Sequence, residues 1–149
     1  MRVEQTPLKD CFIIHDKVHG DARGYFIETY NIRDFKAATG LDIEFVQDNQ
    51  SRSSKGVLRG LHMQKGSAAQ AKLVRVLEGA VLDVAVDLRK GSPSFGQHFA
   101  IELTAENRKQ FFVPAGFAHG FVVLSETATF SYKCDNFYNK ESEGGIIYN

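Results

Sequence analysis

The chain has 149 residues, 43% of them hydrophobic, and its 18 Lys and Arg balance 18 Asp and Glu, so the formal net charge is zero. A chain of this length can bury a sizeable core without disulfides or a structural metal, and we expect one domain over residues 1–149. The balanced charge excludes a global field that would draw the protein to nucleic acid or an anionic membrane, so a local cluster must hold any anionic ligand.

Short strands dominate the predicted secondary structure. The first two cover residues 11–14 and 25–30, and a charged loop with a turn at residues 21–24 separates them. Asn31 is predicted to cap a helix over residues 32–39, which Gly40 ends. Eight further strands are predicted at residues 43–47, 57–64, 72–77, 80–88, 98–103, 110–114, 119–124 and 129–134. This spacing is typical of an all-β sandwich or barrel.

Alternation along these strands predicts which side chains share a face, because successive strand residues point to opposite sides. Asp83 falls between Val81 and Ala85 on a face that is smaller and more polar than core packing alone favours, which indicates a polar barrel lumen. Tyr132 shares a face with Phe130 and is expected to point inward.

Arg59, His62 and Lys72 lie on two neighbouring predicted strands and are candidates for one site. Histidine titrates near neutral pH, so His62 is the natural general base and Lys72 the fixed positive charge. The alternative is a half-buried strand whose polar side chains face water. Strict alternation puts Arg59 and His62 on opposite faces, and we predict a β-bulge at Gly60 that restores a common direction.

Two cysteines and two histidines bear on metal and redox chemistry. Cys11 and Cys134 match no CxxC spacing, so we expect them to be small buried hydrophobic residues in a reducing compartment. The segment 114–120 has the P-x-G-x-x-H form of the second cupin motif and ends in His119 and Gly120. Metal-binding cupins also carry an H-x-H pair followed by Glu, whereas this chain reads His62-Met63-Gln64. Two imidazoles do not make a three- or four-ligand site, so no metal is expected.

Six segments together carry a resemblance to a known family: residues 21–28, 46–51, 56–64, 83–89, 91–96 and 114–120. In their order and content the chain resembles the dTDP-4-dehydrorhamnose 3,5-epimerases, cupin enzymes of dTDP-L-rhamnose synthesis. The resemblance implies an all-β, cupin-type jelly-roll barrel with one or two short helices. Independently of the resemblance, the segment from Met1 to Asp10 is charged and no window approaches the roughly 20 apolar residues of a membrane span, so we expect a cytoplasmic protein.

The resemblance further implies roles for individual residues. His62 matches the general base, Tyr132 the acid on the opposite face, and Lys72 the group beside the sugar carbonyl. Five residues match substrate-binding positions: Gln47, Asp48, Asn49, Arg59 and His119. Five more match positions that hold the nucleotide, the first three usually offered by the partner subunit of a homodimer: Arg23, Phe26, Glu28, Tyr138 and Glu143.

The implied chemistry suits these residue types. A 4-keto sugar has acidified protons at C3 and C5, so a base can leave an enolate that Lys72 stabilises, and a neutral tyrosine can return the proton from the other face. Arg59 and Arg23 fit diphosphate oxygens, and an aromatic ring can stack on the thymine. No redox cofactor is implied.

One departure from the family bears on the base. Family members continue past the equivalent of Asn149 with a Lys-Asp pair whose aspartate orients the catalytic histidine, so without it we expect slower epimerisation. Asp83 is the candidate for the substitute partner of His62, although it could equally pair with Lys72 and would then not fully serve His62. Three other functions stay open: a single-site 3- or 5-epimerase or 3,4-ketoisomerase, a non-catalytic nucleotide-sugar-binding protein, and a metal-dependent cupin oxygenase, which Gln64 disfavours.

Overall fold

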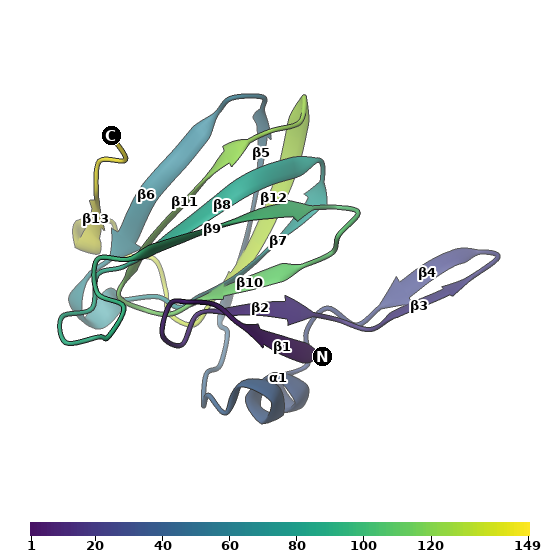
Figure 1. Ribbon diagram of the computed structural model, residues 1–149, viewed down its shortest axis with the longest axis horizontal. Coiled ribbons are helices and arrows are strands. Elements are labelled where there is room, and N and C mark those ends of the chain that lie inside the picture. Colours follow the sequence, from purple (N-terminus) through teal and green to yellow (C-terminus); the bar gives the residue numbers. More distant parts are fainter.

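Two antiparallel sheets packed face to face form the body of the computed structural model, which describes residues 1–149 (Figure 1). The six-stranded sheet has the order β1-β2-β10-β7-β12-β5, formed by Arg2–Gln5, Phe12–His15, Gln110–Val113, Lys72–Glu78, Thr127–Cys134 and Gln47–Ser54. The five-stranded sheet has the order β13-β6-β11-β8-β9, formed by Glu143–Gly145, Leu58–Gln64, Phe117–Val123, Ala80–Asp87 and His98–Thr104. This arrangement confirms the predicted all-β jelly roll.

The main core lies between the two sheets, where apolar side chains from both sheets face one another. Val74, Phe111 and Phe130 face Val81 and Leu103 across this space, each 2% exposed or less. Fully burying a side chain of this size contributes roughly 1.5–3 kcal/mol. Cys11 and Cys134 are both free and buried, which confirms their prediction as small hydrophobic residues.

A second core lies on the outer face of the six-stranded sheet, beneath the helix α1 (Ile32–Thr39). Phe35 is fully buried there, and its ring centroid lies 5.6 Å from that of Phe112. The Asn31 side chain accepts from the backbone N–H groups of residues 33 and 34, and Gly40 ends the helix with a φ of 72°. The predicted helix and both of its caps are confirmed.

The strand predicted at residues 43–47 is wrong, and the strand β5 begins where it was expected to end. Ile43 and Phe45 instead pack beside α1 in the second core. β5 was missed because it has no apolar run: its inward residues include Asn49 and Ser51, which line a cavity, and its outward residues face solvent. It forms through pairing with β12 over its full length.

The two-stranded sheet formed by β3 (Val18–Asp21) and β4 (Gly24–Ile27) extends away from the body (Figure 1). Asp21 pairs with Gly24, so the turn predicted at residues 21–24 is confirmed, although part of the predicted loop is strand. The short strands β1 and β13 were also not predicted, and two 3-10 turns cover Gly66–Ala68 and Lys140–Ser142.

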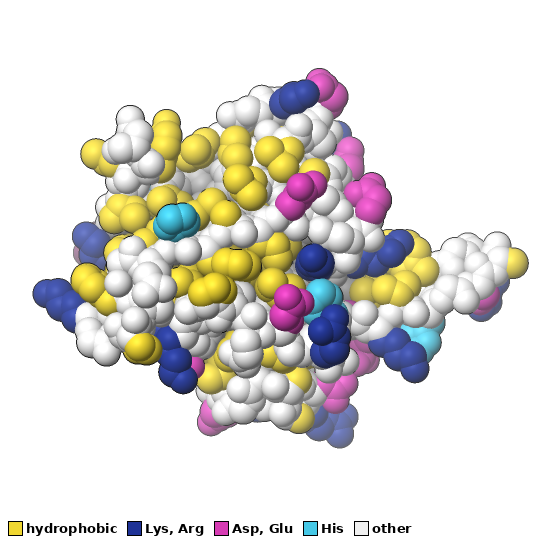
Figure 2. Space-filling model, in the orientation of Figure 1, with side chains coloured by type: hydrophobic (Ala, Val, Ile, Leu, Met, Phe, Trp, Pro, Cys, Tyr) yellow, Lys and Arg dark blue, Asp and Glu magenta, His cyan; other side chains and the backbone are white.

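Figure 2 shows an extended hydrophobic area on the outward face of the five-stranded sheet. Its residues include Leu58, Leu82, Val84 and Val86, and the last three alternate with the buried residues of β8. No helix of the structure has the length and apolar character needed to span a membrane.

Candidate active site

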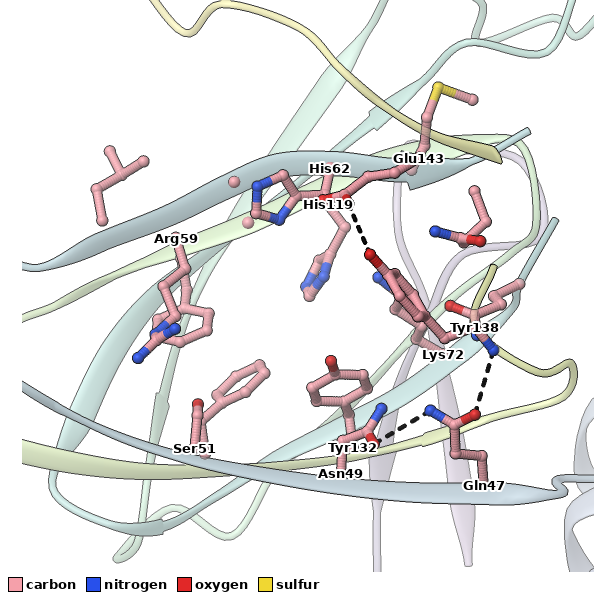
Figure 3. A pocket seen from close by; sticks show the side chains of 18 residues that line it. Gln47, Asn49, Ser51, Arg59, His62, Lys72, His119, Tyr132, Tyr138 and Glu143 are labelled. Atoms are coloured by element: carbon pink, nitrogen blue, oxygen red, sulfur yellow. Dashed lines mark hydrogen bonds between the residues drawn. The ribbon is translucent and has the colours of Figure 1, made fainter. Parts of the chain in front are cut away.

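A cavity of about 650 Å³ opens between the two sheets at the end of the barrel (Figure 3). His62 on β6 and His119 on β11 line it from the five-stranded sheet. Lys72 on β7 and Tyr132 on β12 line it from the six-stranded sheet, as does Asn49 on β5. The predicted base and the predicted acid therefore come from opposing walls of one cavity.

The pairing of β6 with β11 is irregular at Gly60, as predicted. His62 pairs with His119 and Arg59 pairs with Phe121, so two residues of β6 lie opposite the single Gly120. The bulge reverses the alternation and lets both Arg59 and His62 line the cavity. The backbones approach closely here, because a Cβ on Gly60 would lie 2.7 Å from the Cα of Gly120.

The inward direction of Tyr132 is also confirmed. Its ring centroid lies 5.5 Å from Lys72 Nζ and 6.0 Å from that of Phe130. Burial raises the pKa of the Tyr132 phenol, against the smaller opposing effects of the Asn49 amide and the Arg59 charge. Burial likewise lowers the pKa of the Lys72 ammonium, while the charges of Asp83 and Glu143 counteract this. The raised pKa keeps the Tyr132 hydroxyl protonated at neutral pH, and Lys72 lies beside its ring.

The structure corrects the role predicted for Asp83. Its side chain is fully buried, and its Oδ1 lies 2.8 Å from Nε2 of His119, with which it forms a buried pair. In the five-stranded sheet β11 lies between β6 and β8, so His119 rather than His62 is within reach of Asp83. Asp83 is therefore paired with His119, and the structure does not bring it to His62.

The other predicted substrate-binding residues divide between the cavity and the surface. Arg59 lines the cavity, and its Nε donates to Ser53 Oγ at 2.9 Å. Gln47 also lines it and donates from Nε2 to Asn49 Oδ1 at 3.1 Å. Asp48 points to the outer face instead, where it forms an ion pair with Lys133 at 2.9 Å, so the structure does not bring it to the cavity.

Arg23, Phe26 and Glu28 do not line the cavity of their own chain. Arg23 and Phe26 belong to the β3–β4 hairpin, and Glu28 directly follows it. Phe26 is 69% exposed, and Arg23 forms an exposed ion pair with Asp21 at 2.6 Å. Within one chain, these three of the five residues predicted to hold the nucleotide are thus separated from the predicted base and acid.

Tyr138 and Glu143 do meet at the cavity, where the Tyr138 hydroxyl donates to Glu143 Oε2 at 2.8 Å (Figure 3). Gln64 and Gln70 also line the cavity, and sequence reasoning did not select either as a site residue. Alternation along β6 could have predicted that Gln64 lines the cavity, because it places this side chain on the same face as His62.

The side chains present do not suit a metal centre. The structure has no group of three or more His, Cys, Asp and Glu residues that would hold an ion. Gln64 stands where metal-binding cupins are expected to carry a second histidine, and its side-chain oxygen accepts from the backbone N–H of Asn139 at 2.9 Å.

Comparisons with known proteins agree on one family. The family model described as dTDP-4-dehydrorhamnose 3,5-epimerase matches residues 5–149. The dTDP-4-dehydrorhamnose 3,5-epimerase of Salmonella typhimurium is 54% identical over 149 residues, which cover 100% of this chain and 81% of the relative.

Two solved structures extend this similarity to the fold. The dTDP-4-dehydrorhamnose 3,5-epimerase from Elizabethkingia anophelis superposes with a TM-score of 0.97 at 66% identity, covering 100% of this chain and 81% of that one. The dTDP-6-deoxy-D-glucose-3,5-epimerase from Legionella pneumophila, in complex with dTDP-4-keto-L-rhamnose, has a TM-score of 0.95 at 50% identity, covering 99% of this chain and 78% of that one.

Proposed function

The chain belongs to the dTDP-4-dehydrorhamnose 3,5-epimerase family, and from this membership we propose that it epimerises a dTDP-4-keto-6-deoxy sugar in dTDP-L-rhamnose or related deoxysugar synthesis. The observation that carries the proposal is the position of His62 and Tyr132 on opposing walls of one cavity. Inversion of a carbon requires that a proton leave from one face of the sugar and return to the other. A base and an acid on opposing sheets meet this requirement.

The first step is removal of a proton beside the 4-keto group. His62 takes the proton from C3 or C5 as general base, and the electron pair moves into an enolate whose oxygen is O4 of the sugar. Lys72 stabilises this oxygen, and its partly buried position strengthens the interaction because little water screens it. One oxyanion donor of this kind typically contributes on the order of 10² to 10³ in rate.

The second step returns a proton to the opposite face. Tyr132 donates from its hydroxyl to the same carbon, the enolate collapses to the ketone, and the carbon is inverted. The burial that raises the pKa of Tyr132 keeps it protonated before the step, and the nearby Lys72 ammonium stabilises the phenolate after it.

The dTDP half of the substrate needs cationic and aromatic contacts. Arg59 reaches the cavity wall with its guanidinium oriented by Ser53, and its planar fork suits a phosphate oxygen pair. Tyr138 offers an exposed ring at the same cavity for stacking on thymine. We place this enzyme in the cytoplasm, and its two free, buried cysteines support that placement.

The β3–β4 hairpin supports a homodimer in which each subunit completes the site of the other. Its exposed Phe26 and Arg23 offer an aromatic ring and a guanidinium in addition to those of Tyr138 and Arg59. Neither of them lines the cavity of its own chain. Gln110 holds the base of the hairpin, since its Nε2 donates to Thr29 O at 2.6 Å and also to Asp16. We propose that the hairpin is a fixed arm that reaches the cavity of the partner.

Mixed dimers of two inactive variants provide the test of this arrangement. Arg23→Ala and His62→Asn are each expected to lose most activity alone, whereas a re-associated equimolar mixture regains about one quarter of the parent activity. Half of the dimers are then mixed, and one of the two sites in each carries neither defect. No recovery on mixing, or a monomer by light scattering at micromolar concentration, would show that the site is built within one chain.

Solvent exchange tests the activity itself. In D₂O with dTDP-4-keto-6-deoxyglucose, we expect deuterium at both C3 and C5 of the product, observed by NMR. Exchange at one carbon would indicate a 3- or 5-epimerase. A carbonyl group that moves from C4 to C3 would indicate a 3,4-ketoisomerase. If dTDP binds without exchange at either carbon, the chain is a nucleotide-sugar-binding protein and the proposal fails.

A further inference from the structure

The segment of residues 135–142, here called the strap, connects β12 of the six-stranded sheet with β13 of the five-stranded sheet. It carries Tyr138 at the cavity. Side chains and backbone groups hold its two ends: Asp135 Oδ1 accepts from the N–H of Ala71 at 2.6 Å, and the carbonyl of Ser142 accepts from the N–H of Lys65 at 2.8 Å.

Two glutamine side chains hold the middle of the strap from opposite sides. The N–H of Tyr138 donates to Gln47 Oε1 at 3.2 Å, and the N–H of Asn139 donates to Gln64 Oε1 at 2.9 Å. Gln47 belongs to β5 and Gln64 to β6, so the two sheets each hold one of two consecutive backbone groups. The strap is thereby fixed between the walls of the cavity.

The Gln64 contact is the more protected of the two. Gln64 is 6% exposed, so the acceptor of this hydrogen bond is buried and held in place by β6, whereas the donor residue Asn139 is itself exposed. If this acceptor is removed, water can satisfy the backbone N–H of Asn139, but water does not hold that group at a fixed position against β6. The Gln47 amide is oriented by Asn49, as Figure 3 shows.

The ring of Tyr138 depends on this arrangement for its position. It is 53% exposed and is not part of either hydrophobic core, so packing does little to fix it. Its own backbone N–H, that of the next residue, and its hydroxyl bond to Glu143 determine where the ring lies. A ring held before the ligand arrives loses less freedom on binding.

We propose that Gln64 is a positioning residue that fixes the strap, so that Tyr138 is a preformed platform for the base of the nucleotide. The inference rests on the proposed function and deepens it. The strand β6 then serves both halves of the substrate: His62 acts on the sugar, and two residues further along the same face Gln64 sets the affinity for the nucleotide. Gln64 acts through the carbonyl of its side chain, and not through contact with the reacting atoms.

The test compares two substitutions of Gln64 that differ in one property. Gln64→Met keeps the length of the side chain and removes the acceptor, whereas Gln64→Glu keeps an acceptor oxygen. For Gln64→Met we expect the Kd for dTDP and the KM for the sugar nucleotide to rise roughly ten-fold, with kcat changed less than about two-fold. Gln64→Glu is expected to restore both constants to within about three-fold of the parent. Gln50→Met, on the exposed outer face of β5, is the matched control and should behave as the parent.

A second readout needs no substrate. In hydrogen exchange, peptides that cover residues 135–142 should exchange faster in Gln64→Met than in the parent, Gln64→Glu or Gln50→Met. Unchanged exchange or unchanged dTDP affinity in Gln64→Met would overturn the inference, as would an equal loss in Gln64→Glu. These results would leave the proposed function intact if the parent epimerises the sugar nucleotide. A parent that binds no dTDP would overturn both this inference and the proposed function. If Gln64→Met does not fold, Gln64→Ala removes the same acceptor without filling the space of the side chain and faces the same criteria.

Discussion

His62→Asn is expected to slow epimerisation by 10² to 10⁴, roughly the contribution of general base catalysis, while dTDP binds with the affinity of the parent. Asparagine keeps a polar side chain of similar reach but cannot accept a proton at neutral pH. The nucleotide contacts proposed for Arg59 and Tyr138 lie elsewhere in the cavity and are not altered. The measurement is deuterium incorporation at C3 and C5 by NMR, with dTDP affinity determined by calorimetry.

Tyr132→Phe is the matched variant on the opposing wall. With His62 intact, the proton at C3 or C5 should still exchange with solvent, but the inverted product should form far more slowly because the acid is lost. Equal loss of exchange in both variants would contradict the assignment of separate base and acid. Loss of dTDP binding in His62→Asn would show that His62 holds the nucleotide instead.

Asp87→Asn is expected to lower the free energy of unfolding by about 3 kcal/mol at pH 7, since it breaks a buried ion pair from one side. Asp87 is fully buried at the end of β8 and accepts from Arg89 Nη2 at 2.9 Å, Ser92 Oγ at 2.5 Å and Ser94 Oγ at 2.6 Å. Arg89 also contacts Asp10 Oδ2 at 3.0 Å, so the cluster joins the N-terminal segment to the loop after β8.

The ion pair between Asp87 and Arg89 also predicts that the stability of the fold depends on pH. Burial alone raises the pKa of Asp87, but the donors of Arg89, Ser92 and Ser94 outweigh it and hold the pKa well below its ordinary value. The carboxylate therefore contributes stability above the pKa of the unfolded chain, about 4, and the contribution is lost as the pH falls below it. Urea unfolding at pH 7 and at successively lower pH should show the free energy of unfolding of the parent falling toward that of Asp87→Asn.

Asp21→Asn is the control for this experiment, because Asp21 and Arg23 have the same spacing in the sequence as Asp87 and Arg89 but are exposed. We expect no measurable change in its unfolding midpoint, since solvent screens such pairs. A similar loss in Asp21→Asn and Asp87→Asn would show that burial of the carboxylate is not the cause.

Patterns within the sequence predicted those features that local chemistry determines. The helix with its caps at Asn31 and Gly40 follows from side-chain hydrogen bonding and backbone freedom, and the bulge at Gly60 follows from two side chains that must share one cavity. The inward direction of Tyr132 follows from alternation with Phe130, because the apolar neighbour fixes the face.

The features that the sequence did not predict depend on the order of strands in space. The strand β5 has polar residues on both faces, and only its pairing with β12 and its place at the cavity explain it. Asp83 was assigned to the wrong histidine because no local pattern reveals that β11 separates β6 from β8. The role of Gln64 depends on a backbone group 75 residues away, which alternation along β6 does not indicate.

The bulge at Gly60 also limits how this active site can be redesigned. A Cβ on Gly60 would meet the Cα of Gly120 and the carbonyl of His119, and a Cβ on Gly120 would lie 2.6 Å from the carbonyl of Arg59. The obstruction in each case is backbone, so no second substitution in the cavity can make room by shrinking a side chain. Libraries that seek new sugar substrates can therefore vary the walls of the cavity, but both glycines should be held constant, since the common direction of Arg59 and His62 depends on them.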